Sequence, residues 1–356
     1  MNYPWMRCWT WVVAVLLPLS SMAQAAQYPV TAGRVYKFEK IAEGVYYVPS
    51  HGFGSNDVVI VNDDDVVLVD TADTPAAMRT LLADLKVVTD KPVRYVIDTH
   101  WHFDHVDGNS VFGPEVQIIG HEFVRHALES FDVLHREPYA SMGAPDAVAK
   151  VAALERQLTT AKAGEQARLQ HQLAEAQQLQ RDYAEVKVVP PNLTYTDQLI
   201  LQRGGREIDL LFLGRGHTGG DTVVYLPKEG ILCSGDLMET TLPYMGDAYF
   251  DEWITTLGAL KRINFAVDLP GHGVPFADKG LISSLQAYLR DFIAQGEKLH
   301  AQSLSPEQAA KRIDLTVYAK SFPEDIKGVG APILDVKRMY SWLDERAQGK
   351  SSSSTK

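Results

Sequence analysis

The sequence predicts an α/β protein into which a helical hairpin is inserted. Short β-branched runs alternate with segments of helical spacing, a pattern typical of chains whose strand-end loops carry the chemistry. From about residue 144 to 186 the alternation stops, because Ala, Gln, Glu, Leu and Lys dominate and no strand-like run occurs. Histidine and aspartate gather in glycine-rich turns near the ends of the predicted strands. We therefore expect one domain over residues 26–350 that carries a helical insertion.

The first 25 residues have the features of a secretory signal peptide. A positive charge at Arg7 precedes a short apolar run over residues 11–19, and Ala23-Gln24-Ala25 offers small residues for cleavage. We expect cleavage at this point and an exported, periplasmic protein; an uncleaved anchor is the alternative. Later stretches fall short of the ~18 apolar residues of a membrane span, so we expect no stable membrane insertion after cleavage.

Composition narrows the class of partner. The chain has 356 residues, 46% of them hydrophobic and 22% charged, which is ordinary for a globular protein with a substantial core. A formal net charge of −11 argues against a nucleic-acid partner, because phosphate binding requires a basic surface. Once the signal is removed, Cys233 is the remaining thiol and no internal disulfide can form. The oligomeric state stays open.

The first half of the predicted domain opens with a buried hairpin. Residues 41–49 and 57–70 are predicted strands, the second containing two β-branched runs separated by an acidic turn. Residues 75–88 show helical spacing, and residues 93–99 form a further strand. This order of strand, helix and strand indicates an α/β layer.

The insertion at 144–186 is predicted to be an antiparallel pair of helices. Val148, Val151, Leu154 and Leu158 fall on one apolar stripe, and a second stripe of leucines follows Gly164. The pair could act as a lid or dimer contact, or it could be a solvated decoration. Both alternatives remain open.

Strands return after the insertion. They are predicted at residues 199–202, 208–212, 222–226 and 230–233, followed by helices at 253–263 and 281–300. The serine-rich segment 351–356 is predicted to be a disordered tail.

Residues 100–105 have the sequence His-Trp-His-Phe-Asp-His and form half of a candidate metal site. Alternate residues of a strand point to the same face, so we expect His100 and His102 to bind one ion. Asp104 and His105 follow where the strand ends, and can turn toward a second ion. Packing in a protein core does not by itself account for three imidazoles and a carboxylate so close together.

The remaining ligands are expected from distant glycine-rich turns. A zinc ion needs about three protein ligands, and His217, within residues 214–221, is the third for the first ion. Its flanking glycines allow a close approach. His272 completes the second set, and Asp236 is placed to bridge both ions. Nitrogen and oxygen ligands of this kind suit two zinc ions per chain, and iron or manganese fit as well.

In this order the motifs resemble those of the metallo-β-lactamase fold superfamily, from about residue 41 to 275. The family pattern is H-x-H-x-D-H, a single His, then Asp, Cys or Ser, and a final His. The resemblance implies an αββα sandwich with the dinuclear site at one edge of its two sheets, and a role for Asp70 in supporting the ligands by hydrogen bonding. Asp236 is similar to the bridging residue of glyoxalase II and lactonases, whereas antibiotic-degrading members usually carry Cys or Ser. An exported chain without a basic C-terminal cluster fits glyoxalase II itself poorly.

The motifs together predict a metal-dependent hydrolase acting on a small molecule. A metal-bridging hydroxide would cleave an ester, thioester, lactone or related acyl bond. Asp104 is expected to anchor the second ion and, as the lesser role, to accept a proton. Tyr244 and Phe250 are candidate substrate contacts, although aromatic residues equally often pack a following helix.

Two alternatives compete with this function. A class B β-lactamase would use the same hydroxide on a strained lactam, and a non-catalytic metal-binding protein would keep the ligands without turnover. His121 and Cys233 are interpreted as structural, the first beside a predicted helix and the second buried in an apolar strand.

Overall fold

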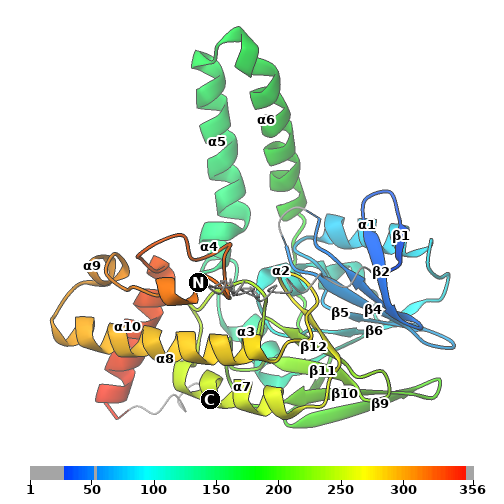
Figure 1. Cartoon of the computed structure of the whole chain (residues 1–356). Coiled ribbons are helices and arrows are strands. Elements are labelled where there is room, and N and C mark those ends of the chain that lie inside the picture. The colour runs from blue at the N-terminus through cyan, green and yellow to red at the C-terminus, as the bar shows by residue number, and fades with distance from the viewer. Residues whose placement is uncertain (1–27, 52–53, 350–356) are drawn as a thin grey trace, which may run out of the picture.

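The computed structural model describes residues 28–51 and 54–349, which form two packed β-sheets with helices on their outer faces (Figure 1). The expected signal peptide (1–25) and tail (351–356) lie outside the described residues. The layer order is helix, sheet, sheet, helix, so the predicted α/β sandwich is confirmed.

The first sheet contains eight strands in chain order. Neighbours are antiparallel from β1 to β5 and parallel from β5 to β8. The strands are β1 (Val30–Ala32), β2 (Lys37–Ala42), β3 (Val45–Val48), β4 (Asp57–Val61), β5 (Val66–Val69), β6 (Val93–Ile97), β7 (Gln117–His121) and β8 (Leu193–Tyr195).

The second sheet has five strands in the order β13-β12-β11-β10-β9. β9 to β12 are antiparallel neighbours, and β13 pairs with β12 in parallel. The strands are β9 (Gln198–Arg203), β10 (Arg206–Phe212), β11 (Thr222–Leu226), β12 (Ile231–Gly235) and β13 (Val267–Pro270).

The period of two along the strands divides the core into layers. In β4, Val58 and Ile60 face the second sheet, where they pack with residues such as Ile208 and Val224. Val59 faces the opposite way and packs under α1 (Pro75–Leu85). On the outer face of the second sheet, a third apolar layer packs beneath α7 (Phe250–Arg262), α8 (Gly280–Ala301) and α10 (Ile333–Ala347).

Shorter helices lie between these layers. They are α2 (Phe103–Val106), α3 (Glu122–Ser130), α4 (Tyr139–Met142) and α9 (Pro306–Ala310), with 3-10 turns at Asp107–Val111 and Thr316–Tyr318. Within the described part of the chain, no helix combines the length and apolar character that crossing a membrane requires.

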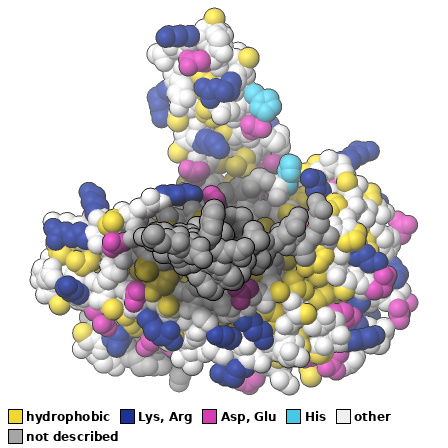
Figure 2. Space-filling model, viewed as in Figure 1, with side chains coloured by type: hydrophobic (Ala, Val, Ile, Leu, Met, Phe, Trp, Pro, Cys, Tyr) yellow, Lys and Arg dark blue, Asp and Glu magenta, His cyan; other side chains and the backbone are white. Residues whose placement is uncertain are grey.

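The helical insertion is a long antiparallel hairpin of α5 (Ala144–Thr160) and α6 (Ala163–Tyr183) that projects from the body (Figure 1). Val151 and Leu154 pack against Leu169 between the helices. Val148 is 49% exposed, so its predicted place in the stripe is wrong. The turn lies at residues 161–162, because Gly164 is already inside α6. Basic and acidic side chains are interspersed over the hairpin (Figure 2).

The sequence pattern missed several short elements. β1, β8 and β13 contain only three or four residues, too few to show a period. The C-terminal helices α9 and α10 were also not predicted. Both cover the second sheet through the third apolar layer, as Ala309 and Met339 do.

Candidate metal centre

The seven predicted ligands meet at one edge of the sandwich, where loops leave the carboxyl ends of strands. Residues 100–105 follow β6, Asp236 follows β12 and His272 follows β13. His217 lies in the loop from β10 to β11. β12 and β13 are parallel neighbours, so Asp236 and His272 lie at the same edge of the second sheet. The packing of the two sheets brings residues 100–105, which follow β6 of the first sheet, beside them, so that residues 172 positions apart become neighbours.

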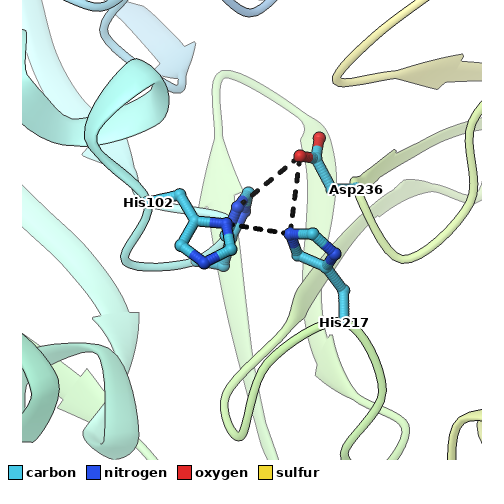
Figure 3. A group of neighbouring side chains, drawn as sticks. His102, His217 and Asp236 are labelled. Atoms are coloured by element: carbon cyan, nitrogen blue, oxygen red, sulfur yellow. Dashed lines mark hydrogen bonds and ion pairs between the residues drawn. The ribbon is translucent and has the colours of Figure 1, made fainter. Parts of the chain in front are cut away.

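A first cluster consists of His100, His102, His217 and Asp236, all buried. The Nε2 atom of His217 lies 2.9 Å from Nδ1 of His102. Oδ2 of Asp236 lies 3.7 Å from Nε2 of His100 and 3.6 Å from Nε2 of His217. Figure 3 shows His102, His217 and Asp236 pointing toward one another.

A second cluster consists of Asp104, His105 and His272. Nε2 of His272 lies 3.0 Å from Oδ2 of Asp104, and Nε2 of His105 lies 3.6 Å from the same oxygen. Asp236 reaches this cluster as well, with Oδ1 3.3 Å from Nε2 of His105 and Oδ2 3.5 Å from Nε2 of His272. Its carboxylate therefore stands between the two clusters.

The local structure of the first motif differs from the strand we predicted. β6 ends at Ile97, and His100 lies in the turn that follows. His102 is the N-cap of α2, with an extended backbone, and Asp104 and His105 are on that helix. A turn and the first residues of a helix, rather than strand alternation, direct the two halves of the motif to two positions.

The glycine beside His217 is required by packing. A Cβ on Gly216 would lie 2.5 Å from Cδ1 of Leu237 and 2.8 Å from Cδ1 of Trp253. The loop can therefore press against α7 only if this position has no side chain.

The donor atoms fit metal ions, because several have no other partner. The buried atoms Nε2 of His100, Nε2 of His105 and Oδ1 of Asp236 make no hydrogen bond. Unsatisfied polar atoms are costly inside a protein, and imidazole nitrogens grouped with carboxylates are ligands of zinc and similar cations. Cations at the two clusters would use these atoms.

Burial and mutual charge set the protonation of the ligands. Burial, with nearby imidazoles, lowers the pKa of His217 to about 3 and that of His100 well below its usual range. Burial alone would raise the pKa of Asp104, but His105 and His272 lower it to about 2. His100 and His217 are therefore neutral, and Asp104 is ionised, at neutral pH.

Asp70 supports ligands of both clusters from behind. Its Oδ2 accepts from Nδ1 of His105 at 2.8 Å and from the hydroxyl of Thr99 at 2.9 Å. That hydroxyl lies 3.1 Å from Nδ1 of His100. Asp70 has a φ of 64°, a left-handed backbone that aspartate tolerates better than most residues. The contacts are those that a supporting role requires.

The two candidate substrate contacts have different surroundings. Tyr244 lies beside the first cluster, its ring centre 5.7 Å from that of His102, and is partly exposed. Phe250 is fully buried and packs against Phe292 and Trp342. Phe250 therefore packs the start of α7 and is not available to a substrate, which corrects that prediction.

The residues interpreted as structural have structural contacts. His121 caps α3 by accepting from the backbone N–H of Phe123, and its ring stacks on Phe212. Cys233 is buried between the two sheets.

One residue of the site was missed by the sequence analysis. Oδ2 of Asp247 lies 3.1 Å from Nε2 of His102, on the side of the ring away from the cluster. Asp247 belongs to no motif and stands 145 positions from its partner. The contact depends on the tertiary fold, and no local signal could have revealed it.

Comparison with curated proteins finds two kinds of relative. The "Linear primary-alkylsulfatase" of Pseudomonas sp. is 23% identical over 71% of this chain, which spans about half (48%) of that protein's length. A "Metallo-beta-lactamase type 2" of Bacteroides fragilis is 23% identical over 81% of this chain and 97% of that protein.

Comparison with solved structures finds the same two kinds of protein, β-lactamases and alkylsulfatases. A metallo-beta-lactamase from Pontibacter korlensis has a TM-score of 0.52 and 21% identity, covering 72% of this chain and 99% of that one. A stereoselective inverting sec-alkylsulfatase from Pseudomonas sp. has a TM-score of 0.61 and 16% identity, covering 89% of this chain and 51% of that one. At these identities the likeness shows a shared fold.

A family model settles the membership. The model of the metallo-beta-lactamase superfamily matches residues 51–272, more than half of the chain and all seven ligand positions. The chain therefore belongs to the metallo-beta-lactamase superfamily of hydrolases.

Proposed function

We propose that this chain is a hydrolase that holds two metal ions, most simply zinc, and cleaves an ester, thioester, lactone or related acyl bond of a small molecule. We further propose that it acts after export to the periplasm, as the signal-like residues 1–25 suggest. The observation that carries the proposal is the position of Asp236, whose carboxylate lies within 3.7 Å of ligand nitrogens from both clusters.

Bound metal ions would supply an activated water at neutral pH and polarise the bond to be cleaved. The protein's own groups prepare the site for this chemistry. The low pKa values of His100 and His217 keep their nitrogen lone pairs free, and Asp236 carries a negative charge because His105 and other imidazoles hold its pKa low in spite of burial. Because Asp104 binds a proton weakly, its low pKa supports a role in anchoring the second ion rather than in accepting a proton.

Sulfate-ester hydrolysis is the second candidate. The sec-alkylsulfatase structure covers 89% of this chain, whereas the Pontibacter β-lactamase covers 72%. More of this chain therefore has a counterpart in the former. A β-lactamase is less favoured, because Asp236 stands where those enzymes usually carry Cys or Ser.

The test combines metal analysis of the purified protein with a substrate panel of β-lactams, lactones, thioesters and alkyl sulfates. We expect two equivalents of metal and turnover of an acyl ester, and both should fall in Asp236→Asn, which removes the charge at the position between the clusters. If only alkyl sulfates are turned over, the protein is a sulfatase and not an acyl-bond hydrolase. If only β-lactams are turned over, it is a β-lactamase. Two bound ions without any turnover would favour a non-catalytic metal-binding protein.

A further inference from the structure

His102 differs from a ligand held by packing alone, because both of its ring nitrogens face polar atoms. Nδ1 lies 2.9 Å from Nε2 of His217 inside the first cluster. Nε2 lies 3.1 Å from Oδ2 of Asp247, which comes from the loop between β12 and α7. The two side chains of this pair are 3% and 11% exposed. A hydrogen bond so shielded from water constrains the ring strongly.

Asp247 is in turn held by Arg136, which lies in the segment that leads into the helical hairpin. The guanidinium donates to Oδ1 of Asp247 at 2.5 Å and leaves Oδ2 for the imidazole. Its central carbon also lies 5.0 Å from the ring centre of Trp101 and 5.1 Å from that of Phe131. A guanidinium can make the ion pair through its N–H groups while its carbon lies close to both aromatic rings, a combination that the compact ammonium group of a lysine does not reproduce.

The loop that carries Asp247 is fastened on its other side by α10. The backbone N–H of Met245 donates to Oδ1 of Asp335, and Arg338 donates to the carbonyl of Ala248 at 3.0 Å. The carboxylate of Asp247 is therefore fixed both through its own side chain and through the backbone on either side. A group fixed in this way can direct a neighbouring ring.

The direction matters because a neutral imidazole has two tautomers. A carboxylate paired with a guanidinium accepts hydrogen bonds, so Nε2 of His102 donates to Asp247 and Nδ1 presents its lone pair to the cluster. In the other tautomer, Nδ1 would donate to Nε2 of His217 across the 2.9 Å between them. That hydrogen bond would occupy the lone pairs of two metal ligands at once.

We propose that Asp247 and Arg136 are a positioning pair that fixes His102 in the tautomer able to bind metal, so that the segment before the hairpin sets the metal affinity of the first cluster. This inference rests on the proposed function for the existence of a metal ion there. It concerns residues that belong to neither cluster, and it predicts an effect on one of the two clusters only.

The test measures the two zinc affinities of the full chain by competition with a chelator, together with the absorption spectrum of the cobalt-substituted protein. Asp247→Asn keeps the size of the side chain and removes its charge. We expect it to weaken the first site by roughly 10- to 100-fold, to change the cobalt bands of that site, and to leave the second site unchanged. Arg136→Gln should weaken the same site less, and Arg136→Lys should restore part of the loss.

Arg79→Gln is the matched control. Arg79 forms an ion pair with Glu185 that also joins the body to the end of the hairpin, but it touches no residue of either cluster. This variant should bind both ions as the wild type does. Circular dichroism of each metal-free variant establishes whether it is folded. If Asp247→Asn does not fold, the zinc affinities of Arg136→Gln provide the test.

Equal weakening of both sites in Asp247→Asn, or wild-type affinity at both, would overturn the inference. A wild-type protein that binds no metal would instead overturn the proposed function. The two failures are therefore distinguishable.

Discussion

Gly271 lies against the ligands so closely that its missing side chain is part of the site. A Cβ at this position would lie 2.2 Å from Oδ1 of Asp236 and 2.8 Å from Cε1 of His105. Ordinary van der Waals contact begins well beyond these distances. The positions of the carboxylate and the imidazole therefore depend on the absence of a single methyl group.

Gly271→Ala should lower metal affinity by about tenfold or more, because the added methyl group displaces the Asp236 carboxylate from its position between the clusters. Zinc titration against a chelator measures the loss. Gly164→Ala is the control, since a Cβ there meets nothing within 4 Å. Unchanged zinc affinity in Gly271→Ala would show that Asp236 moves aside without consequence.

At the scale of elements, the site depends on α10 although α10 contributes no ligand. Asp335 is 3% exposed and accepts from the backbone N–H of Met245 at 2.9 Å. Burial raises the pKa of Asp335 to about 7. Below this pKa, the folded chain therefore holds the side chain of Asp335 in its protonated form.

This shift makes a prediction about stability and pH. Between the unfolded pKa near 4 and the folded pKa near 7, the folded chain holds a proton that the unfolded chain has released, so this residue's contribution to stability falls as pH rises. Asp335→Asn keeps an acceptor for Met245 and removes the titration. The free energy of unfolding of the wild type, measured with urea at pH 4.5 and pH 7.5, should fall between the two pH values by up to about 3 kcal/mol relative to this variant. Parallel pH profiles for the two proteins would contradict the assignment.

The hairpin is the other element that reaches the site from outside the sandwich. At its base, Tyr139 and Tyr183 pack on Phe103, the residue between two of the ligands. Away from the base, its helices pack mainly on each other. Only the base is therefore in a position to affect the ligands.

At the scale of the whole molecule, bound metal and the fold are linked. The clusters gather five imidazoles, four of them buried, and two carboxylates where the two sheets meet, and cations would satisfy those donor atoms that have no hydrogen-bond partner. A ligand that binds only the folded state stabilises it by about 2.7 kcal/mol at a hundred times its dissociation constant.

Removal of metal should therefore lower the unfolding temperature by roughly 5 °C. Calorimetry of the purified protein before and after treatment with EDTA measures the change, and added zinc should restore the original value. An unchanged melting temperature, with metal analysis showing complete removal, would mean that the clusters contribute nothing to stability.

Some of this structure could be predicted from the sequence and some could not. The ligands were predictable because residues 100–105 combine rare residue types within a few positions, and because single histidines and an aspartate stand in glycine-rich turns. The local conformation of residues 100–105 could not be predicted. Alternation of side chains in so short a run does not distinguish a strand from a turn followed by the start of a helix. Asp247 and Arg136 carry no local pattern, and only the fold brings them to His102.

The division of ligands between the two sheets also constrains the order of assembly during synthesis. A nascent chain that ends before residue 200 contains His100 to His105 but lacks every partner that would close either cage. The second cluster is complete only after the last strand, which precedes His272, has joined its neighbour. Occupancy of both clusters would thus require that both halves of the polypeptide have folded and docked.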